Sequence, residues 1–401
     1  MKTFAALLFV AVCSTAASAG GQPPTEPPTP APPLPADVRP APSGPARLAI
    51  EALNPGARPW AELVRGDLRL IADVTVAARS PLRLVAAAEM IEGQRQLRVR
   101  LMSGEQVLDE TVHPLGPVNE TSGLRLAAHR SSDRVLEQLT GRAGGFDSTL
   151  VFARRAGRRR KDVWRVGVDG RDLVRVSSGR HIAMLPALAH GDVWYSIVDR
   201  TGLFLTRAGL DEAPLLGGDG LTMGVTPCGD GIAYAATPSG DSEIYQASLD
   251  GTQTSRLTFH PGIDVSPTCS ARGELAFISN RSGTPQIHVL GADALHPDHV
   301  EQPSSQNQTP TWCPDPERRL LAFTQVERRS SVWTLDLESG ETRRVSPPGR
   351  YKDPAFSPDC RLIAYVGEGG LWLSSLDGRR RRRIVSGAAE TVRWGRLGPS
   401  R

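Results

Sequence analysis

The most constraining feature of this chain is a short apolar motif, ending in an aromatic residue, that recurs six times. The aromatic positions are Phe152, Tyr195, Tyr234, Phe277, Phe323 and Tyr365, and they are separated by 39 to 46 residues. A second ring follows each of them by seven to twelve residues, and most of these rings are followed by a turn. A repeat of roughly 42 residues has room for four short strands, the content of one propeller blade. The sequence therefore predicts a mainly β fold with a six-bladed β-propeller over residues 147–396.

The first and last repeats are complementary. No strand precedes Phe152 to serve as the innermost strand of its repeat, whereas residues 390–394 form a strand left over at the C-terminus. We expect this closing strand to complete the first blade, because closure removes two open sheet edges. Cys360, in the segment DPAFSPDCRLIAY, then occupies a turn in the sixth blade and is one copy of a repeated feature.

A different pattern precedes the repeats. Trp60, Leu63, Val64, Leu68 and Ile71 recur at helical spacing, and residues 82–91, 96–101 and 106–112 have the composition of strands. A second amphipathic stretch runs through Leu124–Leu139 and stops at Gly141. We predict a small α/β domain over residues 46–143.

The N-terminus has the features of an exported protein. Residues 1–19 combine Lys2, an apolar run and small residues before a cleavage point after Ala19, the pattern of a signal peptide, with lipidation at Cys13 as an alternative. Residues 20–45 form a proline-rich arm, interpreted as a spacer or a docking strand. No other segment is apolar enough to predict a transmembrane helix. A formal net charge of +4 gives no argument for a nucleic-acid partner.

Three stretches resemble the TolB family, the periplasmic component of the Tol-Pal system. They are AHRSSDRVLEQLTGRAGGFDSTLVFAR at the junction, DVSPTCSARGELAFISNRSGTPQIHVL in the fourth repeat, and AETVRWGRL at the C-terminus. The resemblance implies a periplasmic scaffold without enzymatic activity that binds the lipoprotein Pal and the inner-membrane protein TolA, and that supports outer-membrane integrity and cell division. In that family a short N-terminal segment contacts TolA, and here the proline-rich arm replaces it.

Known catalytic motifs are absent from the sequence. There is no G-x-S-x-G elbow, H-E-x-x-H helix, P-loop or C-x-x-C pair, and we interpret Gly217–Gly224 as a turn between blades. His296 and His299 are candidate metal ligands, but they fall in an irregular outer strand, and His288 occupies an aromatic position. We therefore predict no metal, no cofactor and no enzyme. An exported propeller enzyme or ligand-binding protein of another pathway is the alternative.

Four cysteines remain after removal of the signal peptide: Cys228, Cys269, Cys313 and Cys360. They permit three pairings in an oxidising compartment. Buried free thiols are the favoured interpretation, and if a bridge forms we expect it between Cys269 and Cys313, which occupy similar heights on neighbouring innermost strands.

The predicted partner site lies where connections between blades enter the innermost strands. Polar residues that packing does not require stand at these positions, and by the resemblance this is also the face that binds Pal. The candidates are His260, Asp264, Gln306, Asn307, Gln308, Lys352 and Asp353, with Arg158, Arg159, Arg160 and Lys161 as a basic rim. Ordinary loop residues are the alternative. A second basic run, Arg379–Arg383, belongs to the opposite face, and either run would attract acidic partners or remain a solvated turn.

Overall fold

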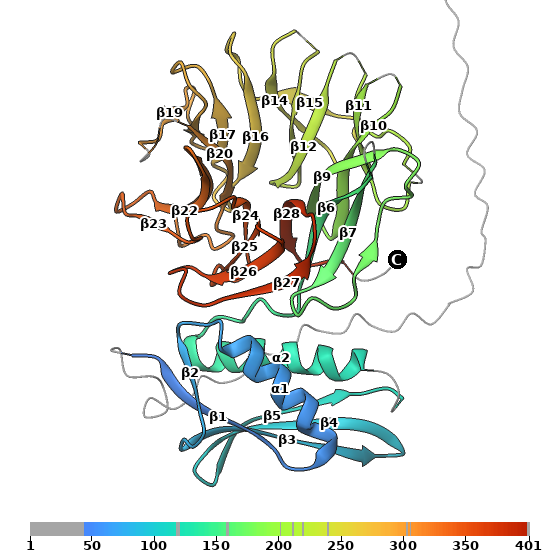
Figure 1. Cartoon of the computed structure of the whole chain (residues 1–401), viewed down its shortest axis with the longest axis vertical. Coiled ribbons are helices and arrows are strands. Elements are labelled where there is room, and N and C mark those ends of the chain that lie inside the picture. The colour runs from blue at the N-terminus through green and yellow to red at the C-terminus, as the bar shows by residue number, and fades with distance from the viewer. Residues whose placement is uncertain are drawn as a thin grey trace, which may run out of the picture. The chain divides into compact units, whose positions relative to one another are not determined.

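A computed structural model describes residues 44–117, 121–157, 160–200, 202–210, 212–218, 220–238, 240–301, 304 and 306–398. The predicted signal peptide, nearly all of the predicted proline-rich arm, and Arg158 and Arg159 lie outside the described residues. The described chain confirms the predicted fold class, a six-bladed β-propeller preceded by a small domain of helices and one sheet (Figure 1).

The N-terminal domain is a five-stranded sheet with two helices. Its strands are β1 (Ala46–Ala52), β2 (Val74–Ala77), β3 (Leu82–Ile91), β4 (Gln94–Ser103) and β5 (Gln106–Pro114). Its two helices are α1 (Arg58–Leu68) and α2 (Ser122–Thr140), and the 3₁₀ turn η1 (Pro55–Ala57) precedes α1. The sheet order is β2-β1-β3-β4-β5, with β1 parallel to both neighbours and β3, β4 and β5 joined by hairpins.

Local sequence accounts for both helices. The side chain of Asn54 accepts a hydrogen bond from the amide of Ala57 and so starts η1, which continues into α1. Trp60, Val64 and Leu68 then form the buried face of α1, as their spacing predicts. Helix α2 ends at Gly141, whose φ of 75° suits glycine at a helix C-terminus.

The propeller consists of six antiparallel sheets in chain order. Blades 1 and 2 contain β28 (Glu390–Gly395), β6 (Thr149–Gly157), β7 (Arg160–Gly167) and β8 (Val174–Arg175), then β9 (Ile182–Ala189), β10 (Asp192–Val198) and β11 (Leu203–Arg207). Blades 3 and 4 contain β12 (Thr222–Cys228), β13 (Gly231–Ala236), β14 (Glu243–Ala247) and β15 (Thr254–Arg256), then β16 (Asp264–Cys269), β17 (Leu275–Ser279), β18 (Gln286–Leu290) and β19 (Asp298–His299). Blades 5 and 6 contain β20 (Asn307–Trp312), β21 (Leu320–Val326), β22 (Ser330–Asp336) and β23 (Thr342–Arg344), then β24 (Lys352–Phe356), β25 (Leu362–Gly367), β26 (Gly370–Ser375) and β27 (Arg381–Ser386).

Blade 1 combines the two ends of the propeller. The C-terminal strand β28 pairs antiparallel with β6, with Arg393 opposite Val151, and so supplies the innermost strand of that blade. Val392 on β28 is fully buried in the core. We call the first strand of each blade its inner strand; the six inner strands are β28, β9, β12, β16, β20 and β24.

The strand order gives the propeller two faces that differ in the connections they carry. Because each blade is antiparallel, the links from an outer strand to the next inner strand emerge on one face, here named the connection face. The turns between first and second strands and between third and fourth strands emerge on the opposite face, here named the turn face. The N-terminal domain contacts the turn face through Arg361 and Arg380 of blade 6 and through Asp169 of blade 1, which accepts from Arg125 at 2.7 Å.

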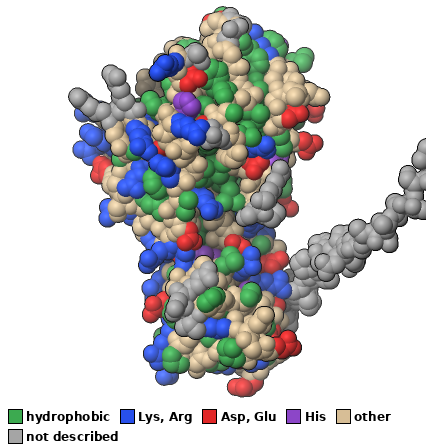
Figure 2. All heavy atoms as spheres, turned by 90° about the vertical axis from the view of Figure 1, so that its right-hand side faces the viewer, with side chains coloured by type: hydrophobic (Ala, Val, Ile, Leu, Met, Phe, Trp, Pro, Cys, Tyr) green, Lys and Arg blue, Asp and Glu red, His purple; other side chains and the backbone are tan. Residues whose placement is uncertain are grey.

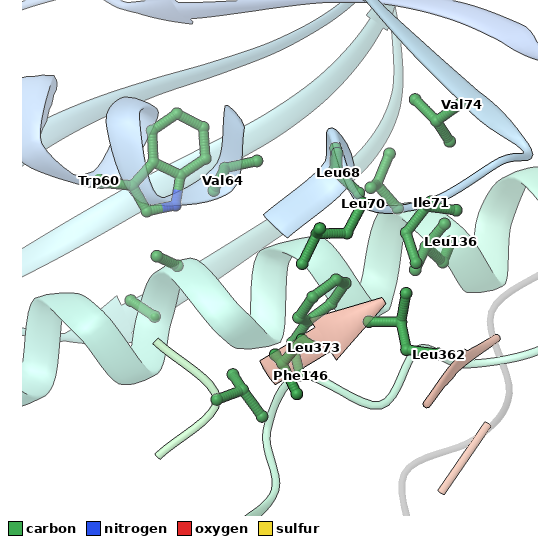
Figure 3. Close-up of a cluster of buried hydrophobic side chains, with 14 of the residues drawn as sticks. Trp60, Val64, Leu68, Leu70, Ile71, Val74, Leu136, Phe146, Leu362 and Leu373 are labelled. Atoms are coloured by element: carbon green, nitrogen blue, oxygen red, sulfur yellow. The ribbon is translucent and has the colours of Figure 1, made fainter. Parts of the chain in front are cut away.

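A shared hydrophobic cluster joins the N-terminal domain to blade 6. Leu136 of α2 and Phe146 of the following segment pack with Leu362 of β25 and Leu373 of β26, and all four are buried (Figure 3). Arg361 adds polar contacts at the same junction, donating to the Thr140 hydroxyl at 2.5 Å and to the Ala143 carbonyl at 3.0 Å. The two domains therefore share one core.

Every inner strand carries a bulge at the same height. The residue concerned has a positive φ of 44° to 71°, and the register against the second strand shifts beside it. These residues are Leu185, Gly224, Ser266, Thr309, Asp353 and Thr391. In several blades the amide of the bulge residue donates to a side chain of the preceding blade, as from Asp353 to the Thr324 hydroxyl at 3.0 Å. The bulges thus fasten neighbouring blades around the channel.

Candidate partner-binding face

The predicted partner residues lie on neighbouring blades at the connection face. His260 and Gln306 belong to the links into β16 and β20, whereas the other five are the first residues of β16, β20 and β24, the inner strands of blades 4, 5 and 6. Gln306, Gln308 and Lys352 are exposed there, and His260 is half-buried. These four side chains are the ones that the predicted surface can present to a partner.

The other three predicted residues are buried inside the propeller. Asp264 is fully buried and accepts from Arg281 at 2.7 Å. Asn307, also fully buried, donates from Nδ2 to the side-chain oxygen of Gln286 at 2.9 Å. Asp353 accepts from the backbone amide of Thr391 at 3.2 Å. Since unpaired buried polar groups are costly, these contacts are structural: those of Asn307 and Asp353 join neighbouring blades, and that of Asp264 lies within blade 4.

The predicted basic rim is only partly described. Arg160 lies 3.2 Å from Asp162, and the ammonium group of Lys161 lies 2.5 Å from the Glu390 carboxylate. Glu390 belongs to the closing strand β28, so Lys161 bridges the third and first strands of blade 1. The lysine therefore has an internal partner, while the Arg160 side chain remains about half exposed.

Two apolar residues that the polar pattern missed project from the same face. Phe259 and Ile263, which flank His260 in the link into β16, are 75% and 54% exposed. The link is anchored by the buried carboxylate of Glu243, which accepts from Arg256, from the Thr258 hydroxyl and, at 2.7 Å, from the His260 amide. The Arg256 guanidinium lies 4.9 Å from the Phe259 ring centroid. The sequence feature that could have predicted these exposed residues is a phenylalanine directly before His-Pro-Gly in a loop between blades.

The second basic run has a structural role that its composition did not indicate. Arg380 donates to the Ile71 carbonyl of the N-terminal domain, and Arg382 donates to the Val168 carbonyl at 3.3 Å. The guanidinium carbons of Arg381 and Arg383 each lie 5.8 Å from the centroid of the Trp372 ring. Only Arg379, with an 86% exposed side chain, fits a solvated turn. The run serves mainly in domain docking and in covering Trp372.

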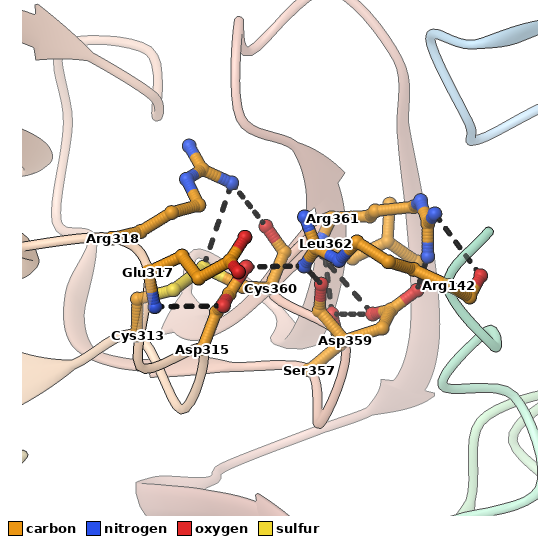
Figure 4. Close-up of a disulfide and its surroundings, with 10 residues drawn as sticks. All are labelled: Arg142, Cys313, Asp315, Glu317, Arg318, Ser357, Asp359, Cys360, Arg361 and Leu362. Carbon is orange, nitrogen blue, oxygen red and sulfur yellow. Dashed lines mark hydrogen bonds and ion pairs between the residues drawn. A yellow bond between two sulfur atoms is a disulfide. The ribbon is translucent and has the colours of Figure 1, made fainter. Parts of the chain in front are cut away.

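The cysteine prediction was wrong. Two disulfides are present, Cys228–Cys269 between blades 3 and 4 and Cys313–Cys360 between blades 5 and 6. The Cα atoms are 5.2 and 5.5 Å apart, within the distance that a disulfide spans, and each pair lies at or just beyond the turn-face ends of neighbouring inner strands. Figure 4 shows Arg318 over the second bridge, donating to the Cys360 carbonyl at 3.2 Å. Each bridge therefore fastens one pair of neighbouring blades.

The two histidine predictions concern blade 4. His288 is 2% exposed, its ring centroid lies 6.1 Å from that of Phe277, and burial lowers its pKa to about 4. His299 packs against it, with the ring centroids 5.3 Å apart. His288 is thus a neutral packed ring, as its aromatic position indicated. Among the described residues, no group of three or more potential ligand side chains is arranged to hold a metal ion.

One side of the surface carries mixed charge (Figure 2). On the side drawn in Figure 2, lysine and arginine side chains are distributed among acidic and apolar ones and form no single basic patch. No helix in the described ranges has the length and apolar character needed to cross a bilayer.

Several comparisons with known proteins find similarity to the same family. A model described as the TolB β-propeller domain matches residues 220–397. The chain is 28% identical over 176 residues to a TolB homolog of Chlorobium luteolum, covering 42% of this chain and 39% of that protein. It is 40% identical over 58 residues to Tol-Pal system protein TolB 1 of Novosphingobium aromaticivorans, covering 14% and 12%. The chain thus matches about two-fifths or less of the length of these curated relatives.

The same similarity extends to a solved structure. The crystal structure of TolB from Acinetobacter baumannii matches with a TM-score of 0.73 and 21% sequence identity, covering 88% of this chain and 96% of that one. The match includes the N-terminal domain as well as the propeller, and at this level of identity it establishes a shared fold.

Proposed function

The propeller of this chain belongs to the TolB family, and from that premise we propose that the protein is a non-enzymatic scaffold of a Tol-Pal envelope system. Its partner on the connection face is a peptidoglycan-associated lipoprotein of the Pal type. Through that contact the scaffold supports outer-membrane integrity and cell division. The name of the Novosphingobium relative, a Tol-Pal system protein, supports the choice of pathway.

The observation that carries this proposal is the composition of the connection face. Phe259 and Ile263 offer exposed apolar area at blade 4, and Gln306, Gln308 and Lys352 offer exposed polar groups on the same face at blades 5 and 6. Protein interfaces commonly combine a central aromatic anchor with a polar rim. Of the predicted partner residues, His260 and the three exposed polar ones would contact the lipoprotein. Asp264, Asn307 and Asp353 would act by holding the links in place.

The proposed location is the periplasm. The signal peptide predicted for residues 1–19 supports export, and two disulfides between blades support an oxidising compartment. An inner-membrane protein of the TolA type remains a second proposed partner. The proline-rich arm of residues 20–45 would be its contact, since it stands where the family has its N-terminal segment.

The test is a binding titration with the purified soluble domain of a Pal-type lipoprotein from the same organism. Replacing Phe259 by serine should weaken binding by tenfold or more, because a central aromatic side chain can contribute about 2 kcal/mol or more to an interface. Lys352→Ala should weaken it less. Both residues are exposed, so the melting temperature should stay within about a degree or two of the parent value.

Arg379→Ala is the matched control, because Arg379 is exposed on the turn face. It should leave the affinity for the lipoprotein unchanged. Loss of binding in this variant with full binding by the Phe259 and Lys352 variants would place the partner on the turn face and refute the assignment. Absence of any binding by the intact protein would refute the proposed partner itself.

A further inference from the structure

The central channel contains a cavity of about 420 Å³ that is lined by all six inner strands. It opens among the turns of the turn face, beside the half-buried Cys228–Cys269 bridge, and is therefore separate from the connection face. One residue from each blade lies two positions after the bulge residue and forms what we call the channel ring. The ring residues are Arg393, Ala187, Thr226, Thr268, Thr311 and Ala355 in blades 1 to 6.

Arg393 is the charged member of the channel ring. Its guanidinium donates to the carbonyl of Val392 at 2.9 Å, and it forms no ion pair with any carboxylate among the described residues. Burial lowers the pKa of Arg393, and the charge of Asp353 opposes that effect. An arginine carries five N–H donors and stays protonated in proteins, so most of this donor capacity is available to a ligand.

Three threonines occupy the opposite side of the channel ring. Successive inner strands are neighbours, so blade 4 lies across the channel from blade 1 and is flanked by blades 3 and 5. The Thr268 hydroxyl accepts from the Trp312 amide at 3.4 Å, which leaves its own proton free to donate. The hydroxyls of Thr226 and Thr311 have no hydrogen-bond partner among the described residues.

Trp312 lies beside the cavity, and its indole packs in the hydrophobic cluster between blades 4 and 5. Trp312 is 4% exposed, it lines the cavity, and its Nε1–H has no hydrogen-bond partner in the described part of the chain. A buried donor without an acceptor is rare and costs free energy. Because Nε1 is enclosed by the packed blades, it does not face the cavity, and the groups that favour a ligand in the cavity are Arg393 and the threonines.

We propose that the channel cavity is a binding site for a small oxyanion, a phosphate or an organic carboxylate. Arg393 would supply a charge-assisted, two-point contact, and the three threonine hydroxyls would donate from the other side. Because planar guanidinium groups match phosphate and carboxylate equally well, the two chemistries share this arrangement. The site lies between disulfide-linked blades, so a bound anion would also fasten blade 1 to the rest of the ring.

The experiment is isothermal titration calorimetry of the full mature chain with inorganic phosphate and with citrate, at constant ionic strength and with chloride as the reference anion. Saturable binding of either oxyanion at one site is expected, and the better of the two identifies its chemistry. Arg393→Met should weaken binding at least about tenfold, since hydrogen bonds to a charged group are the stronger class. Thr268→Val, which keeps the shape of the side chain, should weaken it severalfold.

Two controls make the result decisive. Arg344→Met removes an exposed positive charge from the outer strand of blade 5 and should leave the affinity unchanged, as should Phe259→Ser on the connection face. If Arg393→Met does not fold, Arg393→Lys and Thr268→Val decide the question. Undiminished binding by the folded ring variants, or no saturable binding of either anion by the parent protein, would overturn the proposal. Neither outcome depends on the lipoprotein.

Discussion

The imidazole Nδ1 of His129 on α2 lies 2.8 Å from the carboxylate Oδ2 of Asp67 on α1. Both residues are buried, and the Ser132 hydroxyl also donates to Asp67 at 3.1 Å. On its other side, Nε2 of His129 lies 3.7 Å from Asp169, in the turn between β7 and β8 of blade 1. A single histidine thus connects the two helices of the N-terminal domain with the propeller.

Because of this histidine, the stability of the folded protein should fall as the pH becomes alkaline. Burial by itself would lower the pKa of His129, but Asp67 and Asp169 outweigh burial and raise it to about 10. The folded protein therefore holds a proton that the unfolded chain releases near pH 6.5. The stabilisation is complete below pH 6.5 and is lost as the pH rises through about 10. Urea unfolding at pH 6, 8 and 10 should show the decline.

Replacing His129 by glutamine should remove most of this pH dependence. At pH 6 the variant should lose roughly 3–5 kcal/mol of unfolding free energy, because two buried carboxylates lose a charged partner. His296→Gln, at an exposed position, is the matched control and should keep the parent profile. A His129 variant with the same slope between pH 6 and 10 would show that other groups cause it.

The two disulfides should differ in their resistance to reductant. Cys228 and Cys269 are half-buried, whereas Cys313 and Cys360 are at most 1% exposed. Brief treatment with dithiothreitol followed by alkylation and mass spectrometry should label the first pair before the second. Equal labelling of all four cysteines would contradict this order. Replacing either pair by alanine should cost about 4 kcal/mol, given loops of 41 and 47 residues.

Closure by β28 should control the stability of the whole propeller. Val392→Asp places a charge at a fully buried position on this strand and should destabilise the protein by several kcal/mol or prevent folding. Val174→Asp makes the same substitution on β8, where the side chain is 43% exposed, and should be nearly neutral. Equal melting temperatures for the Val392→Asp and Val174→Asp variants would exclude a closing role for β28. An unchanged melting temperature after deletion of residues 389–401 would exclude it as well.

Arg361 should hold the N-terminal domain to blade 6. Its guanidinium contacts Asp73, Thr140 and Asp359, and its side chain is 9% exposed. Arg361→Ala removes these contacts and leaves the buried Asp359 without this partner, so we expect a loss of roughly 2–4 kcal/mol. Limited proteolysis should cut residues 141–147 faster than in the parent protein. Arg379→Ala, an exposed arginine on the same face, should leave the cleavage rate unchanged.

Local sequence determined the repeated parts of the molecule. An aromatic residue every 42 residues or so marks the second strand of each blade, because that strand is buried on both faces and needs large apolar side chains. Helices α1 and α2 followed from their 3.6-residue period and from Gly141. The short strands β1 and β2 were missed, since they pair in parallel and their partners are distant in sequence.

Tertiary structure decided everything that depends on how blades pack against one another. The four cysteines lie at or just beyond the ends of four successive inner strands, but only the packing of neighbouring blades selects Cys228–Cys269 and Cys313–Cys360. Asp264 and Asn307 read as loop residues, yet adjacent blades enclose them. Arg393 looks like one more exposed arginine on a terminal strand. Closure of the propeller places Arg393 in the channel, across from Thr268. The direction of a side chain in a sheet depends on the neighbouring strands, and the local sequence does not identify them.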